Sequence, residues 1–170
     1  MIYRMYRQVN SSLELGFYVE TTGLLFEPEL KKLQWLIAET FEPGNTGIEP
    51  HIVAAEAVEI GPRLSIETPF SSNAVSICQA MGLRQIIRIE RTHRYLAPNY
   101  SQKEAVRKHI DRMTEQYYSH GITSFDTGTL PENVRVIDLM GRGKEALEEM
   151  NSALGLGMDA RDLEYYQHLF

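Results

Sequence analysis

The sequence predicts an α+β fold, in which antiparallel strands form a sheet that packs against helices. Segments with the period-two pattern of strands alternate along the 170 residues with segments that have the spacing of amphipathic helices. The order strand, helix, strand also occurs twice, over residues 13–60 and 85–140. We therefore expect two lobes that pack as a pseudo-dimer, the first over about residues 1–64, followed near the C-terminus by a helical segment.

The first half of the chain contains the clearest alternation. Residues 2–9 favour a strand, and residues 13–21 alternate apolar and polar side chains as a half-buried strand does. A helix is expected from Pro28, which suits the first turn of a helix, to the break at residues 43–45. A further strand is predicted over about 55–60. The apolar face of the helix is formed by Leu30, Leu33, Ile37 and Phe41.

The second half carries several helix signals. Polar side chains at 71–73 are candidate N-caps, and Gly82 is placed to end the helix that follows. Ser101 and Glu104 form a capping box, and Gly121 is placed to end that helix. Asp159 is a candidate cap of the last helix, which reaches Phe170 inside its apolar stripe. The expected elements are helices over 71–82, 101–121, 144–154 and 159–170 and strands over 85–96 and 134–140.

Composition and charge narrow the class of protein. Hydrophobic residues make up 43% and charged residues 24%, which is the balance of a soluble globular protein. Seventeen Lys and Arg stand against 23 Asp and Glu, and the net charge of −6 disfavours a nucleic-acid partner. No apolar run is long enough to span a bilayer, and the N-terminus lacks the apolar stretch of a signal peptide. We therefore expect no membrane partner and a cytoplasmic location.

No pattern in the sequence supplies a complete active site. The turn Gly141–Lys144 could bind an anion, but Glu145 follows where a phosphate-binding loop needs Ser or Thr, and a tight turn is the favoured interpretation. Cys78, the single cysteine, lies on the apolar face of a predicted helix and is expected to be a small buried hydrophobe. The five histidines form no pair with metal-ligand spacing. The prediction is no catalytic, cofactor-binding or metal site in this chain.

One rigid passage is a candidate for contacts with a ligand or another protein part. A predicted strand runs into Gly61 and Pro62, and a polar helix cap follows ten residues later. A rigid passage of this kind restricts the backbone, which is unfavourable unless its fixed geometry serves a contact. Arg63 and Asn73 are the candidate contact residues within it.

Positive charge is concentrated on the strand 85–96. Alternation places Arg88 and Arg94 on one face of this strand, and Arg91 and His93 on the other. One interpretation is a site for an anionic ligand or an acidic partner. The favoured interpretation is a solvated strand face with cross-strand pairs.

These segments belong to a collinear series of motifs. Over residues 13–170 the series resembles the large single-chain phosphoribosylformylglycinamidine synthases, the glutamine-dependent ligases of purine biosynthesis. Several motifs in the same order are more specific than any one of them. The motifs are Glu59-Ile60-Gly61-Pro62-Arg63-Leu64, Ser72–Cys78, Gly82-Leu83, Arg88–Tyr95, Asp111–Gln116, Gly143–Leu147 and Leu154-Gly155-Leu156.

The resemblance implies a non-catalytic role. In that family the matching region is similar to a fused dimer of a small accessory subunit, here over residues 1–155, and residues 156–170 resemble the start of the family's linker. It implies that ATP and magnesium act in other parts of the enzyme and that this chain packs between the synthetase and glutaminase parts, in cis or in trans, and helps to seal the ammonia passage. The candidate interdomain or ligand contacts are Arg63, Ser72, Asn73, Arg91, Arg94, Arg112 and Glu115.

The chain departs from the family in its first lobe. The family usually has a long helix between its first two strands, whereas residues 2–9 and 13–21 are separated here by only a short connection. The first lobe is therefore expected to lack its opening helix and to leave a sheet face that needs a partner. Two alternatives to a structural module remain open, namely an independent protein that binds a small anion through the basic strand and a small ligase, which the absent nucleotide motifs disfavour.

Overall fold

The computed structural model describes residues 1–38, 43–97, 102–130 and 133–169. The chain forms two compact units, Met1–Thr129 and Leu130–Phe170, and each is considered by itself. This division differs from the sequence-based one at residue 155, and the assignment of residues 1–155 and 156–170 to an accessory domain and a linker stays a prediction. In the part of the chain that the structure describes, none of the helices has both the length and the apolar character needed to cross a bilayer.

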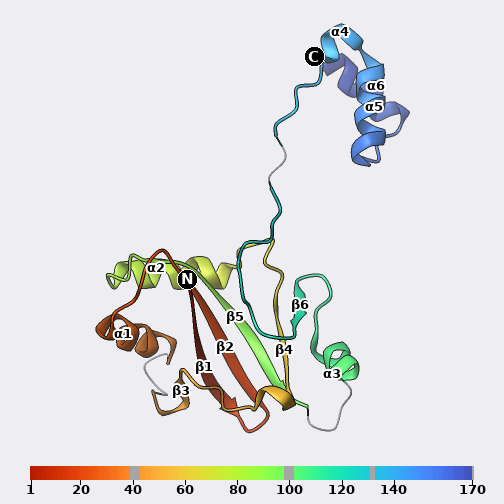
Figure 1. Ribbon diagram of the computed structural model, residues 1–170. Coiled ribbons are helices and arrows are strands. Elements are labelled where there is room, and N and C mark those ends of the chain that lie inside the picture. The colour runs from red at the N-terminus through yellow and green to blue at the C-terminus, as the bar shows by residue number, and fades with distance from the viewer. Residues whose placement is uncertain (39–42, 98–101, 131–132, 170) are drawn as a thin grey trace. The chain divides into compact units, whose positions relative to one another are not determined.

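One antiparallel sheet organises the first unit (Figure 1), and in the described residues its strand order is β3-β1-β2-β5-β4-β6. The strand β5 pairs with both β2 and β4, so strands from both predicted lobes share this sheet. The predicted α+β class is confirmed. The strands are β1 (Ile2–Asn10), β2 (Leu13–Thr21), β3 (Thr46–Gly47), β4 (Ala57–Pro62), β5 (Ile86–Leu96) and β6 (Glu115–Tyr118).

The hairpin of β1 and β2 forms directly, because the connection between them is only a tight turn. Its register places Met5 opposite Phe17, and β5 continues the same row with Arg91 opposite Phe17. Alternation along these strands then gives the sheet one apolar face and one polar face.

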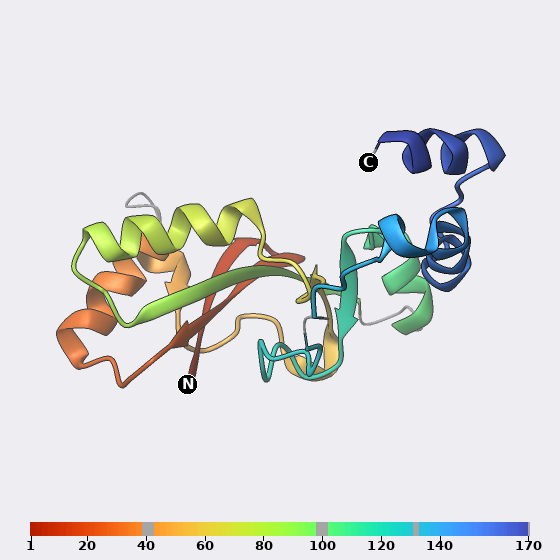
Figure 2. The same ribbon diagram turned by 90° about the horizontal axis from the view of Figure 1, so that it is seen from above.

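Two helices cover the apolar face, as Figure 2 shows from above. The helix α1 (Glu27–Ile37) has Pro28 in its first turn, as predicted, and buries Leu33 and Ile37 against Met5 and Phe17. Phe41 lies outside the described residues. The helix α2 (Pro69–Ala80) buries Cys78 in the same core. Short 3-10 turns occur at Pro43–Asn45 and Ala54–Glu56.

The start of α2 differs from the prediction. Thr68, not one of residues 71–73, is the N-cap, because its hydroxyl accepts a hydrogen bond from the Ser71 N–H at 3.1 Å and Pro69 occupies the first helical position. The end agrees with the prediction. Gly82 adopts a φ of 86°, which allows the Leu83 N–H to reach the Cys78 carbonyl at 2.9 Å.

The predicted helix over 101–121 is wrong in its second half. The helix α3 (Gln102–His109) ends early, and the strand β6 occupies the positions expected to complete its apolar face. The Asp111 carboxylate accepts hydrogen bonds from the Met113 N–H at 2.9 Å and the Thr114 hydroxyl at 2.8 Å, which closes a turn in place of a further helical turn. Ser101 of the predicted capping box lies outside the described residues.

The second unit consists of three helices in its described part, α4 (Leu139–Arg142), α5 (Lys144–Leu154) and α6 (Ala160–Leu169). The predicted strand over 134–140 is wrong. Val134 and Val136 are 96% and 95% exposed, and residues 133–138 contact no partner strand that could use their alternation. Asp138 instead caps α4 by accepting from the Gly141 N–H at 2.9 Å. The predicted cap of α6 is confirmed, because Asp159 accepts from the Arg161 and Asp162 N–H groups.

Candidate functional site

Three of the motif segments meet at one cleft beside the start of α2. The cleft measures about 270 Å³ and lies where β4, β5 and β6 run side by side. It receives residues from the Gly-Pro passage, the basic strand and the segment before β6, which are far apart in the sequence. The residues that line this cleft, which we call the motif cleft, are Pro62, Thr68, Pro69, Phe70, Arg91, His93, Thr114 and Glu115.

Arg91 and Glu115, two of the predicted contact residues, both line the motif cleft. The Arg91 guanidinium lies over the Phe70 ring, 4.8 Å from the ring centre, which holds it against the start of α2. Glu115 accepts a hydrogen bond from the Asp111 N–H at 2.8 Å. The cleft therefore presents one cation and one anion and is not uniformly basic.

Arg63 and Arg112, two further predicted residues, contact each other beside the segment that carries Thr114 and Glu115. The Arg63 guanidinium donates to the Arg112 carbonyl at 2.8 Å, and the Arg63 N–H donates to the Thr114 carbonyl at 2.9 Å. Arg63 thereby fixes the turn that places Thr114 and Glu115 in the lining of the motif cleft. Its role in this structure is to shape the motif cleft from behind, while its side chain stays exposed.

His93 lies inside the same cleft and is electrostatically coupled to it. Burial lowers the pKa of His93 below its usual 6.5, and the neighbouring Arg91 charge lowers it further, while Glu115 acts in the opposite direction. The ring also stacks with Tyr95 at 6.2 Å between centres. The lowered pKa of His93 disfavours its cationic form, which makes this end of the strand a weaker anion site than its composition indicates.

Arg94, another predicted contact residue, is buried on the opposite face of the sheet. It pairs with Glu14, lies 3.4 Å from Glu59 Oε2, and donates to the Ile52 carbonyl at 3.2 Å. Arg88 on the same face pairs with Glu90 at 2.9 Å. Two cations of the basic strand therefore serve the interior, and the predicted solvated face is wrong for them. Arg94 does pair across strands, with Glu14 and Glu59, whereas Arg88 pairs with Glu90 of its own strand.

Ser72 and Asn73, the remaining predicted residues, lie on α2. The Ser72 hydroxyl is exposed and donates to the Thr68 carbonyl at 3.4 Å. Asn73 lines a second hollow between α1 and α2, away from the motif cleft. Contacts from all seven residues to a ligand or another protein part stay a prediction.

Sequence reasoning missed a buried polar cluster behind the cleft. The Tyr18 hydroxyl and the Thr92 hydroxyl both donate to Glu59 Oε1, at 2.5 and 2.7 Å. Glu14 accepts from the backbone N–H groups of His51 and Ile52 at 2.7 and 3.2 Å. In the sequence, only Gly16 and Gly61 could have indicated this cluster. A Cβ at either position would come within 2.6 Å of Thr92, so the packing around Thr92 requires glycine there.

The two cations of the turn at Gly141–Lys144 lie close to carboxylates of α5. Arg142 pairs with Glu149 at 2.6 Å, and Lys144 lies 3.6 Å from Glu148. The Asp138 carboxylate already occupies the Gly141 N–H. Within the described ranges, no three His, Cys, Asp or Glu side chains gather in a way that could hold a metal ion.

Comparison with known proteins agrees with the motif series that forms the cleft. Residues 14–123 match the family described as formylglycinamide ribonucleotide amidotransferase N-terminal. The chain belongs to this family. The predicted resemblance is therefore confirmed, and the matched residues include the strands and turns that build the motif cleft.

Relatives from distant organisms share this similarity. The chain is 39% identical to a probable phosphoribosylformylglycinamidine synthase, chloroplastic/mitochondrial, of Arabidopsis thaliana, with 95% of the chain and 12% of the relative covered. It is 39% identical to the Dictyostelium discoideum synthase over 86% of the chain and 12% of that protein. It is 38% identical to the Homo sapiens synthase over 84% of the chain and 11% of that protein. The family member described here thus spans about an eighth of the relatives that it matches.

Proposed function

We propose that this chain is a non-catalytic structural region of a phosphoribosylformylglycinamidine synthase in purine biosynthesis, which packs between the synthetase and glutaminase parts of the enzyme. The observation that carries the proposal is the meeting of three motif segments at one cleft, where the turn before β6 is fixed by hydrogen bonds. Arg63 holds the turn before β6, Asp111 closes it, and Glu115 binds the Asp111 N–H. These hydrogen bonds fix the shape of the cleft, which suits a surface against which another protein part packs.

The rest of the enzyme would supply the chemistry. ATP and magnesium would act in the synthetase part to activate the amide oxygen of formylglycinamide ribonucleotide, and the glutaminase part would release ammonia. The cysteine in this chain fits no such role, because Cys78 is 3% exposed and burial raises the pKa of its thiol to about 11.

A rigid sheet suits a wall beside an ammonia passage. Ammonia is small and escapes unless its route is enclosed, so the enclosing surface must not open by local fluctuation. In the described part of the chain, no buried side-chain nitrogen or oxygen lacks a hydrogen-bond partner, which disfavours partial opening of the sheet. This supports a role in sealing the passage between the two reaction sites.

Complex formation in trans tests the proposal. The purified chain is mixed with the polypeptide of the same source that carries the synthetase and glutaminase parts, and titration calorimetry measures the dissociation constant. We expect an equimolar complex, and we expect the chain alone to hydrolyse neither ATP nor glutamine. Turnover by the chain alone, or no binding at micromolar concentrations, contradicts the proposal.

A charge reversal at the motif cleft adds a matched control. Glu115→Lys changes the cleft, whereas Glu49→Lys makes the same change at an exposed loop position away from it. We expect at least a tenfold weaker complex for Glu115→Lys and an unchanged one for Glu49→Lys. Circular dichroism confirms that both variants are folded. Equal binding by both would remove the motif cleft from the interface.

A further inference from the structure

The outward face of α2 is uncharged over its whole length. From Thr68 to Leu83 the sequence has no Asp, Glu, Lys, Arg or His, although charged residues make up 24% of the chain. The exposed positions carry small or neutral side chains, and Ile77 is 54% exposed. Depletion of charge on an exposed surface is typical of the centre of a protein interface. Small side chains also let a second helix approach closely.

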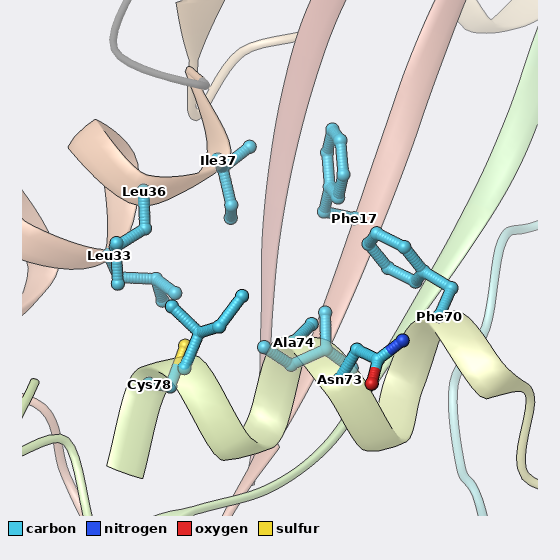
Figure 3. A pocket seen from close by; sticks show the side chains of 10 residues that line it. Phe17, Leu33, Leu36, Ile37, Phe70, Asn73, Ala74 and Cys78 are labelled. Atoms are coloured by element: carbon cyan, nitrogen blue, oxygen red, sulfur yellow. The ribbon is translucent and has the colours of Figure 1, made fainter. Parts of the chain in front are cut away.

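An apolar groove runs along α2 beside α1, and Figure 3 shows the side chains that line it. It measures about 260 Å³, and its floor is formed by Phe17 and Ile89 of the sheet. At one end the Lys32 ammonium donates to the Met81 carbonyl at 2.9 Å and joins α1 to the end of α2. Asn73 is the one lining residue with a polar side-chain amide, and it stands at the mouth. We call this hollow the α1–α2 groove.

Its size favours side chains over a free small molecule. Pockets that bind drug-sized ligands measure roughly 300–1,000 Å³ and enclose most of the ligand. The α1–α2 groove is smaller, and its mouth continues into the uncharged face of α2 at Ile77. An amphipathic helix fits both features, because its apolar stripe fills a groove while its backbone rests on a neighbouring helix.

Two arginines mark the other end of the groove. The Arg7 guanidinium lies 5.8 Å from the centre of the Phe17 ring, and the Arg91 guanidinium lies 4.8 Å from that of Phe70. The two rings are themselves 6.2 Å apart, so the cations flank one aromatic pair. A helix whose acidic side chains or C-terminus lie at this end would meet complementary charge.

We infer that the α1–α2 groove and the outward face of α2 bind an amphipathic helix, supplied by the synthetase or glutaminase part, with acidic side chains at the end beside Arg7 and Arg91. This inference rests on the proposed function, since it names the surface and the kind of element through which the same partner docks. The groove adjoins the motif cleft at Phe70, which lines both, and Arg91 of the motif cleft lies over that ring.

Paired substitutions locate the docking surface in the trans complex. Ile77→Asp places a charge in the groove at a position exposed enough to tolerate it, and Val53→Asp makes a like change at a residue that is 64% exposed and outside the groove. We expect Ile77→Asp to raise the dissociation constant at least tenfold and Val53→Asp to leave it unchanged. If Ile77→Asp binds as tightly as the wild type, the groove inference is overturned while the proposed function stands. If the wild type does not bind, both fail.

Cross-linking identifies what occupies the groove. Asn73→Cys carries a photoreactive benzophenone, which labels selectively because the native Cys78 is buried. The inference predicts cross-links to a partner segment with apolar residues three and four apart and Asp or Glu at one end. Cross-links confined to loops or strands would overturn it. Sedimentation of the chain alone should show a monomer. A dimer that Ile77→Asp abolishes would show that a second copy of the chain fills the groove, and would overturn the inference.

Discussion

The Tyr18 hydroxyl donates to Glu59 Oε1 across 2.5 Å in the interior of the sheet. Burial raises the pKa of both side chains, and the carboxylate next to the phenol raises that of Tyr18 further. The contact joins β2 to β4 although β5 lies between them. It therefore links strands that share no backbone hydrogen bonds, through a cluster on the face of the sheet opposite α1 and α2.

Removal of that hydroxyl should destabilise the first unit. Tyr18→Phe leaves Glu59 Oε1 with Thr92 as its remaining hydroxyl donor, and we expect the free energy of unfolding to fall by about 1–3 kcal/mol. Urea titration followed by tyrosine and tryptophan fluorescence measures the change. The comparison variant is Tyr165→Phe, whose ring is 62% exposed in the second unit. Similar midpoints for Tyr18→Phe and wild type would show that the contact contributes nothing.

Gly61 is expected to be required because Thr92 lies against it. A Cβ at residue 61 would come 2.5 Å from Thr92 Cγ2, so Gly61→Ala should cost about 1–3 kcal/mol of stability. Thr92→Ser removes that methyl group and keeps the hydroxyl that binds Glu59. The loss in the free energy of unfolding of the double variant should therefore be smaller than the sum of the losses of the two single variants, as measured by urea titration.

Gly16→Ala, combined with Thr92→Ser in the same way, is the control for the Gly61 result. Its added Cβ would meet the Thr92 hydroxyl oxygen at 2.6 Å, which Thr92→Ser retains, so no rescue is expected there. Gly23→Ala has no atom within 4 Å of the new methyl group and should be neutral. Equal rescue at residues 16 and 61 would show that the effect is not steric.

Acid should weaken the fold through His93. Its pKa is below 6.5 in the folded chain because of burial and the nearby Arg91, so the unfolded chain binds more protons as the pH falls. The stability is therefore complete above pH 6.5 and decreases from there down to the folded pKa. His93→Gln should flatten this part of the stability curve, measured by urea titrations between pH 5 and 8.

A comparison with His109 makes the pH test specific. His109 stacks on Tyr95 at 3.9 Å, and burial lowers its pKa as well, but it lies outside the motif cleft. A neighbouring cation lowers the pKa of each histidine, Arg91 for His93 and Lys108 for His109, but His93 is more deeply buried. We therefore expect His109→Gln to flatten the curve less than His93→Gln. The reverse order would contradict the electrostatic account of the cleft.

The thiol of Cys78 should be protected in the native chain. Burial raises its pKa to about 11, so at pH 8 its reaction with Ellman's reagent should be slower than that of the urea-unfolded chain by on the order of 100-fold or more. The rate of release of the coloured thiolate measures this directly. Rapid stoichiometric labelling of the folded chain would show that α2 opens readily, against the account of a closed core beneath it.

Periodicity was sufficient to predict the strands that carry apolar side chains on one face. The alternation in residues 13–21 gave β2 its bounds, and α1 followed from Pro28 and the spacing of Leu33 and Ile37. The same period could not show that the polar face is also buried. Glu14 and Glu59 look solvated in the sequence, but both are buried, Glu14 against the backbone of His51 and Ile52 and Glu59 against Tyr18.

The errors have local causes that act against propensity. Val134 and Val136 favour a strand, but a strand needs a partner, and their segment has none in the described residues. Residues 110–117 have helical spacing, yet the Asp111 side chain closes a turn and pairing with β4 draws the following residues into β6. Of the predicted contact residues, Arg91 and Glu115 line the motif cleft, and contacts from any of the seven to a ligand or another protein part stay a prediction.

We propose that this chain couples the synthetase and glutaminase reactions without performing either of them. The most direct measurement compares amidine formation by the synthetase and glutaminase parts with glutamine and with ammonium chloride as the nitrogen source, in the presence and absence of the chain. We predict that omission of the chain abolishes most of the glutamine-dependent rate and leaves the ammonium-dependent rate largely intact. Equal loss of both rates, or loss of neither, would contradict this account.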